Sequence, residues 1–349
     1  MKLRDAFPTA ALLALGGVVA LGLAELGVRA LERFEILEGS GQSAIFEDGP
    51  FQGTFRLSQN PRLVLELDPE DPSINDDGFR DRSFPVERGA ATRIVALGDS
   101  VTFGWGVPTE DAWPKQLERL LAADDGPDPE VLNLGVGGYN TRQEVEFYEE
   151  RGRKYDPDLI VVGFVLNDCF PPDWHPRPRP LAARPRPVFL LAGFPGLAFD
   201  HSRLLALLRD RLGGGDERGE AAIRRRVLGS CGKPDLWRIV TRGFARLESI
   251  AHWDGSHVLI VVIPMLIDTS RYPFTALHQS VVAEAKLRGH SVLDLLGAFS
   301  EHDARSLRLS SADTTHPNAA GHRLVAESIH AFLRESGLLE RARAARGER

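Results

Sequence analysis

The sequence predicts an α/β protein in which helices cover both faces of a central parallel sheet. From residue 91 onward, short apolar runs alternate with segments that have the pattern of helices. Apolar runs of about four to eight residues are typical of strands that are buried on both faces, as in a parallel sheet. Right-handed crossovers then place the intervening helices on both sides of that sheet. The domain is therefore expected to have three layers.

The individual elements follow from these runs. The predicted strands, rich in Val, Ile and Leu, are residues 94–97, 131–134, 159–165, 258–263 and 292–295. The predicted helices lie near residues 113–122, 141–155, 237–252, 279–288 and 319–339. The tetrapeptide Thr141-Arg142-Gln143-Glu144 has the pattern of a capping box, so we expect the second helix to begin there.

The N-terminal segment has the composition of a membrane anchor. Residues 6–24 are mostly apolar and follow the basic start Met1-Lys2-Leu3-Arg4. About 19 apolar residues can cross a bilayer as a helix, and a basic flank keeps its end in the cytoplasm. We expect residues 1–34 to be a signal anchor that leaves the catalytic part on the extracytoplasmic, periplasmic side of the cell membrane. The alternative is a cleaved signal peptide, with Gly22-Leu23-Ala24 as the cleavage site, and a secreted protein.

The remaining regions divide by composition. Residues 35–90 are expected to form a linker and, from about residue 61, a short β-rich lead-in that contains a turn at 75–78. Residues 91–340 form the main domain, and residues 341–349 a basic, frayed tail. The third and fourth strands are separated by a long insertion, residues 170–235, with a Pro-rich beginning. Such an insertion beside a strand end is either a lid or a solvated spacer.

Charge and cysteine content narrow the function. A formal net charge of −7 gives no basic field, so the composition does not support nucleic-acid binding. The two cysteines, Cys169 and Cys231, form no CxxC or Cys/His pattern, so no structural metal site is expected. They could form a disulfide in an oxidising compartment, or remain two buried thiols; the sequence leaves both open.

Residues able to carry hydrolytic chemistry follow the predicted strands or precede the last helix. In open α/β sheets, ligands bind beyond the carboxyl ends of the strands, so these residues are expected to meet in one site. The set consists of Asp99 and Ser100 after the first strand, Gly138 after the second, Asn167 and Asp168 after the third, and Asp313 and His316 before the last helix.

Each of these residues has a chemical role in the predicted site. Ser100 would attack an ester carbonyl, His316 would accept its proton, and Asp313 would orient the imidazole. The tetrahedral intermediate needs hydrogen-bond donors, which the N–H groups of Ser100 and Gly138 and the amide of Asn167 would supply as an oxyanion hole. The two other carboxyl groups are expected to support the site by hydrogen bonding.

Structural explanations exist for parts of this pattern. The segment Gly98-Asp99-Ser100 could merely cap a helix. Glu327 and His330 repeat the spacing of acid and histidine inside an amphipathic helix, where a structural surface pair is expected. Trp105 and Trp113 are expected in the core or at the rim of the site, and Trp105 is close enough to Ser100 in sequence to line a pocket.

Over residues 91–335 the chain resembles the SGNH (GDSL-type) esterases and acylhydrolases, whose four name-giving residues would be Ser100, Gly138, Asn167 and His316. The resemblance implies a flavodoxin-like fold and hydrolysis of acyl esters of lipids, small molecules or carbohydrates without a cofactor. The organisation looks like the membrane-anchored bacterial members. Two positions depart from the family pattern: Val101 replaces the usual Leu, and Val165 replaces the usual Gly of the third block.

These observations predict an extracytoplasmic serine esterase that forms an acyl-enzyme. Two alternatives remain: an O-acyltransferase that acts on cell-envelope polysaccharide, as some members of the family do, and a non-catalytic envelope scaffold. The expected partners are an ester substrate and, through the N-terminal helix, the membrane.

Overall fold

The computed structural model describes residues 16, 20, 22–27, 54–87, 89–124, 128–171, 215–311 and 313–347. The chain divides into two compact units, one of residues 49–178 and 220–349 and one of residues 1–48 and 179–219. In the smaller unit, residues 22–27 are helical, with Leu23 and Leu26 exposed. Most of the expected membrane anchor and the Pro-rich part of the insertion lie outside the described residues. Among the helices that the structure describes, none combines the length and apolar character of a membrane span.

The larger unit contains the parallel sheet that the sequence predicts. Its strand order is β4-β3-β5-β6-β7. Each strand coincides with a predicted apolar run, and the central strands are buried because helices cover both faces. The strands are β3 (Thr92–Gly98), β4 (Pro129–Gly135), β5 (Leu159–Phe164), β6 (His257–Val262) and β7 (Ser291–Asp294).

The register aligns the carboxyl ends of three strands. Gly98, the last residue of β3, pairs with Gly135 of β4 and with Gly163 of β5. Glycine is required at the first of these positions because a Cβ atom on Gly98 would collide with the side chain of Thr102 in the following turn. The chain segments that leave β3, β4 and β5 therefore begin at one edge of the sheet.

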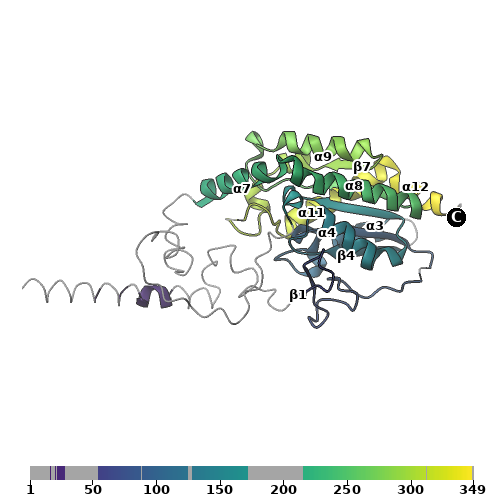
Figure 1. Cartoon of the computed structure of the whole chain (residues 1–349), viewed down its shortest axis with the longest axis horizontal. Helices are drawn as coiled ribbons and strands as arrows, with labels where there is room; N and C mark the ends of the chain where they lie inside the picture. The colour runs from purple at the N-terminus through teal and green to yellow at the C-terminus, as the bar shows by residue number, and fades with distance from the viewer. Residues whose placement is uncertain are drawn as a thin grey trace, which may run out of the picture. The chain divides into compact units, whose positions relative to one another are not determined.

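Helices form the outer layers of the sheet. Helices α3 and α11 pack against each other, and α8 packs against both α4 and α9 (Figure 1). The predicted second helix continues past α4 as a π-helical turn, Tyr148–Gly152, and a 3₁₀ turn, Arg153–Tyr155. The helices are α3 (Trp113–Ala122), α4 (Thr141–Phe147), α8 (Pro234–Asp254), α9 (Thr275–Leu287), the short α10 (Leu296–Ser300) and α11 (Ala319–Ser336).

The capping box of α4 lies one residue earlier than expected. The side chain of Asn140, not of Thr141, accepts a hydrogen bond from the N–H of Gln143. The side chain of Gln143 in turn accepts from the N–H of Asn140. Asn is as good an N-cap as Thr, and its carbonyl satisfies a free N–H group of the first turn.

The expected frayed tail is wrong. Helix α11 ends because Gly337 takes a left-handed conformation, with φ of 61°, and a new helix, α12 (Leu338–Gly347), follows. Leu338, Leu339 and Ala342 are buried, and Arg343 donates a hydrogen bond to the Thr92 hydroxyl at 2.6 Å. The many arginines of this segment led to the prediction of solvated chain, but the burial of its few apolar residues stabilises a helix.

The lead-in contains a two-stranded antiparallel sheet of β1 (Phe55–Leu57) and β2 (Leu65–Leu67). Strand β1 lies in a part that we expected to be linker. The predicted turn is present, since the side-chain oxygen of Asn75 accepts from the N–H groups of Asp77 and Phe79. This turn leads directly into Arg80, a buried residue whose guanidinium contacts the segment that follows β3.

Candidate active site

The nucleophile candidate lies at the start of a one-turn helix beyond β3. Asp99 caps this helix, α2 (Ser100–Phe103), because its Oδ1 atom accepts a hydrogen bond from the N–H of Val101 at 2.9 Å. The helix ends at Gly104, which has a left-handed φ of 86°. Ser100 is 8% exposed. Asp99 therefore caps the helix, as one explanation of the motif proposed, and the same cap holds Ser100 at the end of β3.

The structure brings Ser100 and His316 together from opposite ends of the domain. The Nε2 atom of His316 lies 2.9 Å from the Ser100 hydroxyl, and its Nδ1 atom lies 2.8 Å from Oδ2 of Asp313. The other Asp313 oxygen accepts from the N–H groups of Thr315 and His316. The carboxyl group is thus fixed by its own turn, and it fixes the imidazole.

The surroundings of His316 favour its protonated form. Burial alone would lower the pKa of His316, but the charge and hydrogen bond of Asp313, with the charge of Asp99, raise it above its ordinary value. Burial would likewise raise the pKa of Asp313, yet the charge and hydrogen bond of His316 lower it. The side chains are 12% and 15% exposed, so solvent screens this pair only in part. The pair can therefore stabilise an imidazolium.

The loop that carries His316 is held by backbone pairing. The N–H of Leu309 donates to the carbonyl of His316 at 2.9 Å, and Arg308 pairs with Pro317 in an isolated β-bridge. Asn318 caps α11 immediately afterwards. Trp105 is the aromatic residue beside the imidazole, with 5.9 Å between ring centres, whereas Trp113 is fully buried in the core, as expected.

Asn167 lies near Ser100 in a short 3₁₀ helix, η5 (Leu166–Cys169), that follows β5. Its amide nitrogen donates to Oδ2 of Asp99 at 2.5 Å, the same oxygen that lies 3.2 Å from the Ser100 hydroxyl. Asp168 accepts a hydrogen bond from the N–H of Val165 and so closes the first turn of η5. Val165 has ordinary extended angles, φ −119° and ψ 154°, so this position does not need the family's glycine.

Gly138 is in the turn that follows β4. Its φ of 80° lies in the left-handed region that glycine tolerates without strain. The turn is joined to the nucleophile strand, because the N–H of Val136 donates to the carbonyl of Gly98 at 3.1 Å. Gly138 is therefore at the same edge of the sheet as Ser100 and Asn167.

The sequence did not assign a site role to Arg80. Its guanidinium donates to the carbonyl oxygens of Phe103, Gly104 and Val107, at 3.1, 2.7 and 2.8 Å. These bonds fasten the segment that follows the nucleophile. The sequence offered only the turn signal that precedes Arg80, and the role of this arginine is seen from its contacts.

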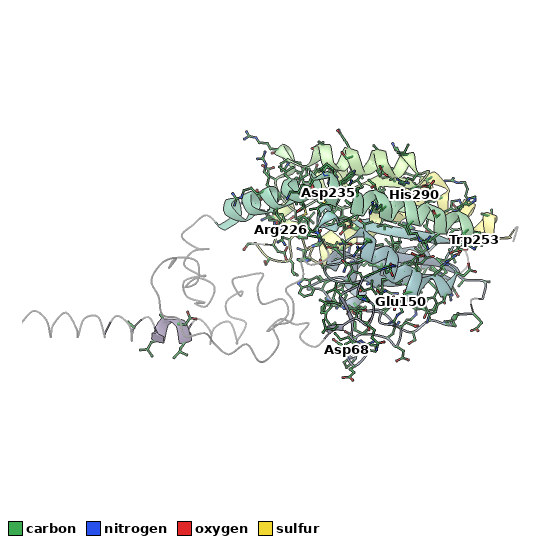
Figure 2. All side chains as sticks on the ribbon, viewed as in Figure 1. Asp68, Glu150, Arg226, Asp235, Trp253 and His290 are labelled. Carbon is green, nitrogen blue, oxygen red and sulfur yellow. A yellow bond between two sulfur atoms is a disulfide. The ribbon has the colours of Figure 1, made fainter. Side chains whose placement is uncertain are left out.

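A helix from the insertion, which the sequence did not predict, braces the site from two sides. Helix α7 (Gly215–Cys231) is joined to η5 by a disulfide between Cys231 and Cys169, whose Cα atoms are 5.4 Å apart. Arg226 of α7, which is labelled in Figure 2, lies over the ring of Phe170, with 5.0 Å to the ring centre. Glu220 of α7 accepts from Arg308 at 2.7 Å, next to the His316 loop. The insertion thus contacts both the Asn167 and the His316 segments.

The acid and histidine expected to pair within α11 do not do so. His330 instead places its Nε2 atom 2.7 Å from Oδ2 of Asp124, beyond the end of α3. The interpretation of His330 as a structural residue holds, but its partner comes from another helix. Within the described ranges, no three His, Cys, Asp or Glu side chains are grouped so that they could hold a metal ion.

Comparisons with known proteins give a consistent result. A model of the GDSL-like lipase/acylhydrolase family matches residues 96–324. An arylesterase of Vibrio mimicus is 30% identical over 86 residues, 24% of this chain and 42% of that protein. An acetylxylan esterase of Xylanibacter ruminicola is 28% identical over 112 residues, 30% of this chain and 22% of that protein. The chain thus spans less than half the length of each of these relatives. A crystal structure of TesA aligns with 70% of this chain and 98% of its own, at 16% identity and a TM-score of 0.43.

Proposed function

Because this chain belongs to the GDSL-like lipase/acylhydrolase family, we propose that it is a serine esterase that cleaves carboxylic esters through an acyl-enzyme. The observation that carries the proposal is the relay of hydrogen bonds from Ser100 through His316 to Asp313. A serine hydroxyl alone is a poor nucleophile, and an oriented base in contact with it makes the attack possible.

In the first half-reaction, the Ser100 oxygen bonds to the ester carbonyl carbon while His316 Nε2 takes the hydroxyl proton. Asp313 keeps the Nδ1 proton of the imidazole in place and stabilises the imidazolium. When the tetrahedral intermediate collapses, the bond to the alcohol oxygen breaks, and His316 gives its proton to that leaving group. The product of this step is the acyl ester of Ser100.

The negative charge of the tetrahedral oxygen needs donors at the edge of the sheet. We assign this role to the N–H groups of Ser100 and Gly138 and to the amide of Asn167. An amide nitrogen carries two hydrogens, so Asn167 can keep its bond to Asp99 and still donate to the oxyanion.

In the second half-reaction, water replaces the alcohol. His316 takes a proton from the water as its oxygen attacks the acyl carbon, and returns that proton to Ser100 as the acid leaves. The names of the relatives suggest the substrate class, since one is an arylesterase and the other an acetylxylan esterase. We therefore propose short acyl groups, acetyl first, on aryl or sugar alcohols.

We further propose that the catalytic domain, residues 91–340, lies on the extracytoplasmic side of the membrane behind the N-terminal anchor. The disulfide between Cys169 and Cys231 supports an oxidising compartment. Fractionation of cells that express the full-length protein tests this, with protease treatment of spheroplasts to find the exposed side. Recovery in the soluble cytoplasmic fraction, with both thiols free, would reject the proposed location.

The activity is tested with the purified full-length protein and p-nitrophenyl esters from acetyl to palmitoyl, with Ser100→Ala as control. Turnover that is highest for acetyl and is lost in the variant supports the proposal. Acyl transfer to an added oligosaccharide in excess over hydrolysis would instead indicate the O-acyltransferase. Equal turnover by both proteins would reject Ser100 as the nucleophile.

A further inference from the structure

Three carboxyl groups are buried behind the nucleophile. Asp99 and Asp168 are completely buried, and Glu144, in the first turn of α4, is 2% exposed. Only Asp99 touches a reacting group. A buried carboxyl group normally has a hydrogen-bond partner or a counter-charge, so the other two need an explanation.

The partners of the three groups differ. Both oxygens of Asp99 accept hydrogen bonds, from the N–H of Val101 and from the amide of Asn167. Asp168 accepts one bond with Oδ2, but its Oδ1 atom has no partner among the described residues. Neither oxygen of Glu144 has a partner there, and neither does Oδ1 of Asn167. Among the described residues, four buried acceptor atoms thus lack a donor, and the hydroxyl groups of Thr141 and Tyr148 are likewise buried without a partner.

Protonation supplies the missing donor. An ionised carboxyl group only accepts hydrogen bonds, whereas a protonated one also donates through its O–H. Burial, followed by the charge of Asp99, raises the pKa of Glu144 well above its ordinary value. Burial and then the charges of Glu144 and Asp99 do the same for Asp168. Burial raises the pKa of Asp99 as well, but the hydrogen bonds from Asn167 and Val101 and the charge of His316 oppose that rise.

Among the residues that the structure describes, no cation acts on the pKa of Glu144. From its own helix, the N-cap residue Asn140 donates to the carbonyl of Phe170 at 2.9 Å, which fixes α4 against the end of η5. Helix α8 packs on α4, and its buried residues are apolar or glycine. The charge of Asp99 affects the pKa of Glu144, and the charges of Glu144 and Asp99 affect the pKa of Asp168. The charge of His316 affects the pKa of Asp99.

We propose that Glu144 is a positioning residue that remains protonated and donates a hydrogen bond to the Oδ1 atom of Asp168. Asp168 then uses one oxygen for Glu144 and the other for the N–H of Val165. This arrangement holds η5 in place and keeps the amide nitrogen of Asn167, rather than its oxygen, directed at Asp99. Glu144 thereby acts on the oxyanion hole without contacting substrate.

Three variants on one helix test this role, and this part of the test rests on the proposed esterase function. Glu144→Gln keeps a donor of the same shape, and we expect kcat within about threefold of the parent. Glu144→Leu removes the donor, and we expect kcat to fall by about 10²-fold with little change in KM, because Asn167 is displaced. Glu146→Gln is the matched control, since Glu146 is on the same helix and bonds only at the surface to Asn60 and Arg62.

A second measurement does not require turnover and covers the case in which Glu144→Leu fails to fold. In the unfolded state, Glu144 loses its proton above about pH 4.3, the ordinary pKa of Glu, whereas in the folded state it keeps the proton to higher pH. The free energy of unfolding therefore decreases as pH rises from about 4.3 to the pKa of Glu144 in the folded protein. In Glu144→Gln this slope should decrease by about one proton. Infrared difference spectra should show the C=O band of a protonated carboxyl group that disappears in the same variant.

The results separate the inference from the proposed function. A parent protein without ester turnover, but with the infrared band and the changed slope, would reject the esterase and keep the protonated Glu144. Loss of activity in Glu144→Gln, with the fold intact and no band lost, would show that Glu144 acts as a carboxylate and overturn the inference. Full activity in Glu144→Leu would overturn it as well.

Discussion

The amide nitrogen of Asn167 lies 2.5 Å from Oδ2 of Asp99, the residue directly before the nucleophile. Two chain segments that follow neighbouring strands, β3 and β5, are thereby joined across the site. The same Asp99 oxygen is 3.2 Å from the Ser100 hydroxyl, so Asp99 contacts both the proposed nucleophile and the proposed oxyanion donor. This relationship makes the effect of substitutions at Asn167 predictable.

Asn167→Ala should lower kcat by about 10²–10³-fold with a small effect on KM, because it removes one donor to the oxyanion. Asn167→Asp should be at least as damaging, since it places a second carboxyl group against Asp99 and supplies no N–H. Steady-state kinetics on p-nitrophenyl acetate measures both. Asn60→Ala, at a surface asparagine that bonds Glu150, is the control and should leave kcat unchanged. An Asn167→Ala variant with parental kcat would remove Asn167 from the oxyanion hole.

The rate should depend on the ionisation of His316. Only the neutral imidazole accepts the Ser100 proton, so kcat/KM should rise with pH through the pKa of His316. Asp313 raises that pKa, so the midpoint should lie above the ordinary histidine value of about 6.5. Asp313→Asn should move the midpoint to lower pH and reduce kcat by about 10⁴-fold. A midpoint that is unchanged in Asp313→Asn would contradict the assigned pairing.

The disulfide should stabilise the domain and support the rate. Cys169 is two residues from Asn167, and its bridge to Cys231 closes a loop with a sequence separation of 62. Reduction should cost about 2–5 kcal/mol of unfolding free energy and lower kcat, because η5 loses its connection to α7. Thermal melts and assays with and without dithiothreitol measure both effects. The double variant Cys169→Ser with Cys231→Ser should not respond to the reductant, and a parent protein with two free thiols before reduction would refute the bridge.

Arg80→Met should destabilise the domain by about 3 kcal/mol or more, because three carbonyl groups lose their charged donor in a buried place. Arg80→Lys should recover only part of this loss, since an ammonium group does not match the spread of the guanidinium donors. Urea unfolding measures the difference. Arg62→Met provides the control, since Arg62 is an exposed partner of Glu146. Equal stability of the Arg80→Met protein and the parent would show that Arg80 does not hold the nucleophile turn.

The strands and the position of Ser100 at the edge of the sheet were predictable from the sequence because they depend on local patterns and on a general rule of topology. The runs that became β3, β4 and β5 are apolar over their whole length, and parallel strands must end at a common edge. That rule places the segments after β3, β4 and β5 together, whereas His316, in the loop before α11, reaches Ser100 across 216 positions of sequence through the fold of its own loop.

The missed features depend on long-range contacts. The residues around Arg80 in the sequence do not indicate that its side chain binds the carbonyl groups of the turn after Ser100. Similarly, the sequence around Glu144 does not show whether this acid, in the first turn of a helix, is exposed or buried. His330 was assigned the nearest acid in sequence, but the fold offers Asp124 from another helix. Helix α12 was hidden because its arginines dominate the composition while a few spaced apolar residues determine its packing.

The most direct test of the catalytic proposal is the hydrolysis of p-nitrophenyl acetate by the full-length protein, by Ser100→Ala, by His316→Ala and by the double variant. If the two residues act as one unit, each single variant should lose on the order of 10⁶-fold in kcat, and the double variant no more than either. All variants should melt as cooperatively as the parent. Losses that add, or a Ser100→Ala variant that retains the parental rate, would contradict a mechanism in which His316 activates Ser100.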